Sequence, residues 1–181
     1  AEAFRARGIL VVMGGPHATL LPAEAAPHAD IVVTGEAELQ WARVLRAVES
    51  EARFQPGVHV IDERTGASVE ALPNGARIYR CPAPANLADL PHARRELIRH
   101  GGWNQWWATQ TPMIATRGCP HQCDYCTIPL IYPHARQMRF RPIVQVVAEV
   151  AASPDKGIVF WDDNLIADRE RAKSLFRAIA P

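Results

Sequence analysis

The chain has 181 residues, with 20 basic and 19 acidic side chains and a formal net charge of +1. A charge so close to zero gives no broad field that would draw the protein to nucleic acid or to an anionic membrane, so neither is an expected partner. Hydrophobic residues make up 48% of the chain, yet no apolar run approaches the roughly 20 residues of a transmembrane helix. The first residues lack the pattern of a signal peptide, and a reduced cytoplasm is the expected compartment.

The N-terminal region shows the β-α-β-α order of an α/β sheet. Residues 8–15 and 30–36 are short apolar runs, typical of strands that are buried on both faces of a parallel sheet. A short helix is expected over 20–29 and an amphipathic helix over 37–51. The apolar face of the second helix would contain Trp41, Val44, Leu45 and Val48. Two parallel strands cannot cover themselves, so we expect this region to be the last part of a larger domain.

Residues 52–110 change in character and are expected to connect two α/β regions. Residues 57–72 alternate between polar and apolar side chains on either side of a central turn, which predicts an antiparallel hairpin. From Cys81 to about Gln110 the chain is rich in Pro, Ala and Asn and shows no sustained period, as in a linker. Its largest apolar side chains are Trp103, Trp106 and Trp107. Packing is the favoured role for these tryptophans, and lining a substrate entrance is the alternative.

The α/β order returns after the linker. We predict strands at 112–118 and 157–164 and helices at 142–153 and 168–180. Two β-α units are the beginning of a barrel or a wound sheet, and a complete (β/α) barrel needs far more chain than remains. The sequence is therefore expected to be a piece that is truncated at both ends.

Three of the four cysteines lie in the loop after the strand at 112–118. Cys119, Cys123 and Cys126 have the spacing C-x3-C-x2-C, and Gly118 and Pro120 can bend the loop so that the sulfurs converge. Loops at the carboxyl ends of parallel strands are where such folds keep their chemistry. Thiolates are the ligands of iron–sulfur clusters. Three thiolates would hold three irons of a four-iron cluster and leave the fourth iron open to a substrate.

This spacing, with the aromatic Tyr125 directly before the last cysteine, resembles the signature of the radical S-adenosylmethionine (radical SAM) superfamily. The resemblance implies that Cys119, Cys123 and Cys126 bind a [4Fe-4S] cluster, whose open iron chelates the methionine moiety of SAM. An electron from the cluster then cleaves SAM, and the resulting 5'-deoxyadenosyl radical removes a hydrogen from an unreactive C–H bond. Tyr125 would lie near the adenine. The cofactors carry this chemistry, while the protein supplies geometry and excludes water.

Asp162, Asp163 and Asn164 gather two carboxylates and an amide at the end of the strand at 157–164. These groups are expected to meet the ammonium of the methionine moiety, a charge-assisted contact that suits a carboxylate. The alternative is that they cap the following helix. Arg139 and Arg141 could face the methionine carboxylate, although a solvated surface position is favoured for both.

The N-terminal region resembles the last third of the cobalamin (B12)-binding domain that precedes the radical domain in one large subgroup of the superfamily. The resemblance covers residues 11–41, "VVMGGPHATLLPAEAAPHADIVVTGEAELQW". In that domain the glycine pair after the fourth strand lets the backbone approach the nucleotide tail of cobalamin. The resemblance therefore assigns Gly14 and Gly15 to the cofactor, with Gly35 and Glu36 beside them after the fifth strand. His17 is assigned no metal.

Together these features predict an α/β chain of three parts. Residues 1–51 would be the C-terminal part of a flavodoxin-like (Rossmann-type) cobalamin-binding domain, residues 52–110 the hairpin and linker, and residues 111–181 the start of a partial (β/α) TIM-type barrel.

The function implied is radical SAM chemistry, with cobalamin-dependent methylation of an unactivated carbon as the leading reaction. The expected partners are a small-molecule or lipid-like substrate and an electron donor such as flavodoxin or ferredoxin. One alternative is radical oxidation or ring rearrangement without bound cobalamin. The other is a non-enzymatic zinc-binding module, in which His121 or His134 would complete a Cys3His site.

Overall fold

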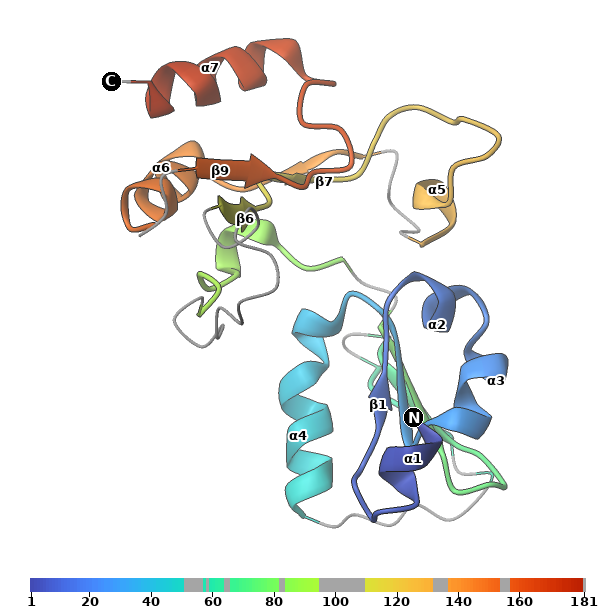
Figure 1. Ribbon diagram of the computed structural model, residues 1–181. Coiled ribbons are helices and arrows are strands. Elements are labelled where there is room, and N and C mark those ends of the chain that lie inside the picture. Colours follow the sequence, from blue (N-terminus) through green and yellow to red (C-terminus); the bar gives the residue numbers. More distant parts are fainter. Residues whose placement is uncertain are drawn as a thin grey trace. The chain divides into compact units, whose positions relative to one another are not determined.

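The computed structural model describes residues 1–50, 57, 59–63, 66–81, 84–94, 110–131, 137–153 and 157–180 (Figure 1). The chain divides into two compact units, of which unit 1 contains residues 1–85 with 130–133 and unit 2 contains the remainder. No helix in the described ranges is both long enough and apolar enough to cross a membrane. Several residues named above lie outside the described ranges: Trp103, Trp106, Trp107 and His134.

Unit 1 is built on a mixed sheet with the strand order β1-β2-β5-β4-β3. Three strands are parallel: β1 (Val12–Met13), β2 (Ile31–Gly35) and β5 (Arg77–Cys81). β4 (Ser68–Ala71) runs antiparallel to β5, and β3 (His59–Ile61) runs antiparallel to β4. The helices are α1 (Glu2–Arg5), α2 (Pro16–Leu20), α3 (Pro22–Ala25) and α4 (Trp41–Glu49), with 3-10 turns η1 (Ala26–His28) and η2 (Ala37–Leu39). The expectation of an α/β fold is confirmed at this level.

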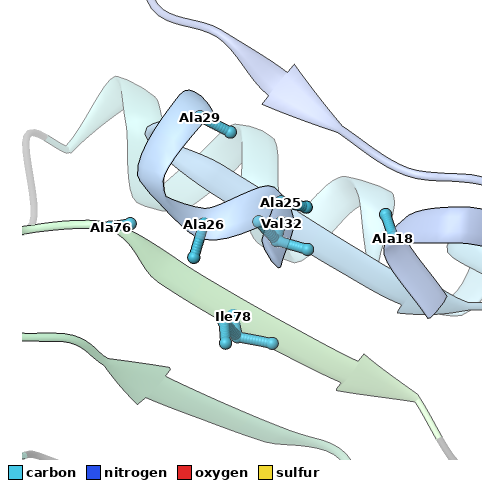
Figure 2. Packing of buried hydrophobic residues seen from close by; sticks show 7 residues of the cluster. All are labelled: Ala18, Ala25, Ala26, Ala29, Val32, Ala76 and Ile78. Atoms are coloured by element: carbon cyan, nitrogen blue, oxygen red, sulfur yellow. The ribbon is translucent and has the colours of Figure 1, made fainter. Parts of the chain in front are cut away.

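β2 is buried on both of its faces, as the apolar run at 30–36 predicts. Val32 packs among alanines of α2, α3 and η1 and against Ile78 of β5, as Figure 2 shows. Ile31 and Val33 point to the opposite face, where they pack with Val44 of α4. The small alanine side chains allow helical backbone to lie close to the sheet. α2 and α3 therefore cover one face of the sheet and α4 covers the other (Figure 1).

The predicted hairpin is present as β3 and β4, but it does not stand apart as a connector. β5 joins it to the parallel strands, because β5 pairs with β2 on one side and with β4 on the other. Residues 77–81 had no predicted strand, since Arg77 and Arg80 interrupt the apolar pattern. In the sheet, Ile78 and Tyr79 are buried on opposite faces, which stabilises this strand despite the two arginines.

The amphipathic helix is present as α4, but its buried face differs from the predicted one. Val44 is 1% exposed, whereas Trp41 and Leu45 are 44% and 43% exposed. The helix packs on the sheet through Val44 together with Ala47 and Val48. The assignment of Trp41 and Leu45 to this buried face was wrong, because the small Ala47 occupies the position in contact with the sheet.

Unit 2 contains a parallel strand pair, β6 (Gln110–Met113) and β9 (Gly157–Phe160), and an antiparallel pair, β7 (Thr116–Arg117) and β8 (Arg139–Phe140). The chain crosses between β6 and β9 through α6 (Ile143–Ala151), and α7 (Arg169–Ile179) follows β9. Two smaller elements are η3 (Leu87–Asp89) and α5 (Ile128–Ile131), the second of which spans the boundary between the units. The core of unit 2 consists of Ala115, Val146 and Leu175, with Ile143, Phe160, Leu165 and Ile179 packed around them.

A buried ion pair lies beside this core. The Nη1 atom of Arg141 lies 2.6 Å from Oε2 of Glu149, and the two side chains are 9% and 4% exposed. The same guanidinium donates a hydrogen bond of 3.0 Å to the carbonyl oxygen of Ile114, just after β6. The favoured surface position of Arg141 was therefore wrong: its charge is paired inside the unit and ties α6 to the end of β6.

Candidate functional site

The carboxyl ends of β6 and β9 lie at the same edge of unit 2. Met113 and Phe160, the last residues of the two parallel strands, are register partners, and the amide of Trp161 donates a 2.8 Å hydrogen bond to the carbonyl oxygen of Met113. The segments 114–118 and 161–164 therefore leave the strands side by side. The first leads directly into the cysteine loop, and the second carries the three polar residues singled out in the sequence.

The Asp162 side chain binds the main chain that follows β6. Its Oδ1 and Oδ2 atoms accept the amide hydrogen of Ala115 at 3.1 and 3.2 Å, and Oδ1 also accepts the amide hydrogen of Thr116. Burial raises the pKa of the Asp162 carboxyl above its ordinary value, and the negative charge of Asp163 acts in the same direction. The hydrogen bonds from Thr116 and Ala115 oppose this rise of the pKa.

Asp163 and Asn164 make the next two contacts along the same segment. Oδ2 of Asp163 accepts the amide hydrogen of Gly118 at 2.8 Å, and Nδ2 of Asn164 lies 3.5 Å from Sγ of Cys119, to which it donates. The alternative helix-capping role belongs to a different residue. Asp168 is the N-cap of α7, and its Oδ1 accepts the amide hydrogen of Arg171 at 3.0 Å. Asp168 was not among the predicted capping residues, although an Asp directly before a helix is the usual signal for a cap.

The three cysteines of the loop are free thiols that a ligand can reach. Cys123 is exposed, whereas Cys119 and Cys126 are partly exposed. A turn joins the last two, since the amide of Cys126 donates a 2.9 Å hydrogen bond to the carbonyl oxygen of Cys123. Tyr125, within this turn, is 91% exposed.

The donor set of this loop fits an iron–sulfur cluster in its chemistry, because it offers three accessible thiols within eight residues. Within the described ranges, no group of three or more His, Cys, Asp or Glu side chains is gathered around a position for one metal ion. A cluster does not require such a group, since each thiolate binds a different iron.

In unit 1, Gly14 and Gly15 lie where β1 ends and α2 begins. Gly14 lines a pocket of about 680 Å³. Gly15 has φ +91° and ψ −172°, a conformation that essentially only glycine adopts, and it directly precedes Pro16 at the start of α2. The other residues that line the pocket are Ala1, Glu2, Ala3, Met13, His17, Ala18, Glu24, Ala25 and His28.

Gly35 and Glu36, which follow β2, make contacts inside unit 1. Gly35 has φ +75°, and a Cβ atom at this position would lie 2.6 Å from the carbonyl oxygen of Cys81. The buried carboxylate of Glu36 accepts the amide hydrogen of Ala85 at 2.7 Å. Neither residue is among those that line the pocket beside Gly14.

Comparisons with known proteins relate the chain to methyltransferases, although no family model matches it. The chain is 31% identical over 129 residues to bacteriochlorophyllide d C-8(2)-methyltransferase of Chlorobaculum tepidum, covering 71% of this chain and 24% of that protein. It is 26% identical over 168 residues to bacteriochlorophyllide d C-12(1)-methyltransferase of the same organism, covering 89% of this chain and 31% of the relative. The chain thus spans 24% and 31% of the length of these two relatives, less than a third in both cases.

The fold is similar to that of a solved radical S-adenosylmethionine methyltransferase. The protein is TsrM from Kitasatospora setae, determined with tryptophan substrate and a SAM analog bound. The TM-score is 0.63 at 20% sequence identity, and the similarity covers 97% of this chain and 34% of that structure. The similarity therefore extends over residues of both units.

Proposed function

We propose that the chain belongs to a radical SAM methyltransferase and that Cys119, Cys123 and Cys126 hold its [4Fe-4S] cluster. The observation that carries the proposal is the position of the C-x3-C-x2-C loop, which begins at the carboxyl edge of the parallel pair β6 and β9. The similarity to two bacteriochlorophyllide methyltransferases supports methylation as the reaction. When bound, the cluster supplies the electron that cleaves SAM.

The protein's own residues would bind SAM and keep it oriented. Tyr125 offers an exposed ring to the adenine. The sequence predicted that Asp162, Asp163 and Asn164 contact the ammonium of SAM, but the hydrogen bonds of the two carboxylates to the entry of the cysteine loop favour a different role for them. Residues 111–181 would then be the beginning of the partial (β/α) barrel.

Residues 1–51, which lie in unit 1, would be the C-terminal part of a flavodoxin-like cobalamin-binding domain, and bound cobalamin would supply a transferable methyl group. The pocket beside Gly14 supports this proposal, because a residue without a side chain leaves room for a ligand to approach the backbone. Gly15 and Gly35 would shape the surrounding turns through their positive φ angles. Glu36 would position the segment after β2 through its hydrogen bond to Ala85.

The proposed substrate is a small or lipid-like molecule, and the proposed electron donor is a flavodoxin or ferredoxin in a reduced cytoplasm. The two bacteriochlorophyllide methyltransferases act on the pigment in their names, which supports a small-molecule substrate for this chain. Radical oxidation or rearrangement without cobalamin would use the same cysteine loop and differs only in the fate of the substrate radical.

Anaerobically reconstituted full-length protein is expected to contain about four irons and four sulfides per chain. After reduction it should convert SAM to 5'-deoxyadenosine and transfer a methyl group that originates from SAM, measured by mass spectrometry with isotopically labelled SAM. Zinc as the sole metal in protein purified without oxygen would contradict the proposal and favour the zinc-binding module. Formation of 5'-deoxyadenosine without methyl transfer would favour the oxidation or rearrangement reaction.

Replacing Gly14 by Leu is expected to weaken the binding of hydroxocobalamin roughly tenfold to a hundredfold, because overpacking a fitted site costs about 1–3 kcal/mol. A Cβ atom at Gly14 would lie 3.5 Å from its nearest neighbour, the carbonyl oxygen of Val33, which is an ordinary van der Waals distance. A loss of affinity can therefore be attributed to the cofactor site rather than to a clash within the protein. Gly14→Ala is the graded control, with a smaller loss. Gly15 is a poorer probe because its φ of +91° strains any other residue. Equal affinity of the wild-type and Gly14→Leu proteins would remove Gly14 from the site.

A further inference from the structure

The segment Asp162–Asn164 contacts the entry of the cysteine loop through all three of its side chains. Asp162 accepts two amide hydrogens from residues 115 and 116, Asp163 accepts one from Gly118, and Asn164 donates to the sulfur of Cys119. Successive residues of the segment 162–164 thus contact successive positions of the chain between residues 115 and 119. They join positions that lie 45 to 47 residues apart in the sequence.

The hydrogen bonds of Asp162 and Asp163 can form only when the main chain of residues 115–118 adopts one particular conformation. Both oxygens of Asp162 are directed at the amide of Ala115, and Oδ1 also reaches the amide of Thr116. Gly118, at the last position before the first cysteine, has φ +98° and is held by Asp163 at 2.8 Å. Ala115 and Thr116 are 0% and 2% exposed, so water is not available to replace these bonds.

We propose that Asp162, Asp163 and Asn164 are positioning residues for the cysteine loop, and that the two carboxylates serve the main chain rather than the ammonium of SAM. Asp162 and Asp163 fix the direction in which the loop leaves β7, and Asn164 fixes Sγ of Cys119. The part that concerns Asn164 rests on the proposed cluster, whereas the part that concerns the carboxylates does not.

Asn164 would also influence the electron-transfer properties of the cluster. A hydrogen bond to a ligand sulfur stabilises the reduced, more negative state and so raises the reduction potential. Among the three cysteines of the described loop, the structure gives this contact to Cys119. Asn164→Asp keeps the size of the side chain but removes the donor, and Asn164→Ala removes the whole amide. Both variants should therefore shift the potential in the negative direction.

The first test measures amide hydrogen exchange in the full-length protein without metal. In Asp162→Ala the amides of Ala115 and Thr116 should exchange roughly tenfold to a hundredfold faster than in the wild type. Asp162→Asn retains Oδ1, the oxygen shared by both amides, and should preserve most of the protection. The matched control is Asp168→Ala, which removes a carboxylate from the same connection and should leave these two amides unchanged. Unchanged protection in Asp162→Ala would overturn the positioning role.

The second test separates the main-chain role from a contact with SAM. Asp162→Asn and Asp163→Asn remove a charge but keep an acceptor, so positioning predicts that the dissociation constant of SAM, measured by anaerobic calorimetry, stays within about threefold of the wild-type value. An ammonium contact predicts a rise of roughly tenfold to a hundredfold. Such a rise with unchanged amide exchange would overturn the proposal.

The third test is an EPR-monitored redox titration of the reconstituted protein. Asn164→Ala and Asn164→Asp should both have a more negative potential than the wild type and than Asp168→Ala, at equal iron content. A potential that is the same in all four proteins would overturn the role of Asn164. A wild-type protein that takes up no iron would instead contradict the proposed function, while the exchange experiment would still decide the role of the carboxylates.

Discussion

Replacing any one of Cys119, Cys123 or Cys126 by Ala is expected to abolish the cluster, measured as iron content and as loss of the broad absorption near 400 nm that reports thiolate-to-iron charge transfer. The effect should be close to complete because a cluster that has lost one of three protein ligands exposes a second iron to solvent. Reductive formation of 5'-deoxyadenosine from SAM should disappear with it. The wild-type protein, reconstituted in parallel, gives the reference value.

Cys81→Ala is the matched control for these variants. Cys81 is a buried thiol at the end of β5 in unit 1, and it lies within a strand rather than in the loop. Its replacement should leave the iron content and the absorption spectrum unchanged. An essential Cys81 would show that four thiolates close the site, which would refute the open iron on which the proposed binding of SAM depends.

The second large expected effect is a loss of stability when the buried ion pair of Arg141 and Glu149 is broken. Glu149→Gln is expected to lower the free energy of unfolding by roughly 3–5 kcal/mol, because it leaves the positive charge of Arg141 buried without its partner. The variant keeps the shape of the side chain, so the loss is electrostatic. Denaturation in urea, followed by circular dichroism, measures it.

The double variant Arg141→Met, Glu149→Leu tests the reason for that loss. Removing both charges removes the need to solvate either of them, so most of the stability should return. Lys173→Ala is a control for a surface pair, since Lys173 and Glu170 are both exposed and their 2.7 Å contact should contribute little. A Glu149→Gln protein as stable as the wild type would show that the pair is not buried in solution.

The strands and helices with strong apolar patterns could be predicted from the sequence. β2 and α6 have such patterns, and both are present close to their predicted bounds. β1 is shorter than its apolar run, since it pairs over Val12–Met13 with β2 while Ile9 and Leu10 are 45% and 42% exposed. Apolar patterns thus predict that an element exists more reliably than where its pairing begins.

The sequence was less informative about contacts between distant residues. β5 was not predicted because it is stabilised by pairing with two other strands, β2 and β4. The arginines within it interrupt the apolar pattern by which a strand is recognised from its own sequence. The polar group at 162–164 could be recognised by its residue types, but its main-chain partners could not. Those partners depend on the register of β6 with β9, which no short-range pattern specifies.

Asp162 and Asp163 accept hydrogen bonds from main-chain N–H groups, so these bonds do not depend on which side chains occupy positions 115, 116 and 118. Substitutions at these three positions can therefore leave the hydrogen bonds intact, provided that the new side chain can be packed there. Proline is the exception, because it has no N–H to donate. Across diverging copies of this chain, the absence of proline at these positions would be a more durable mark of the arrangement than the identity of any residue there.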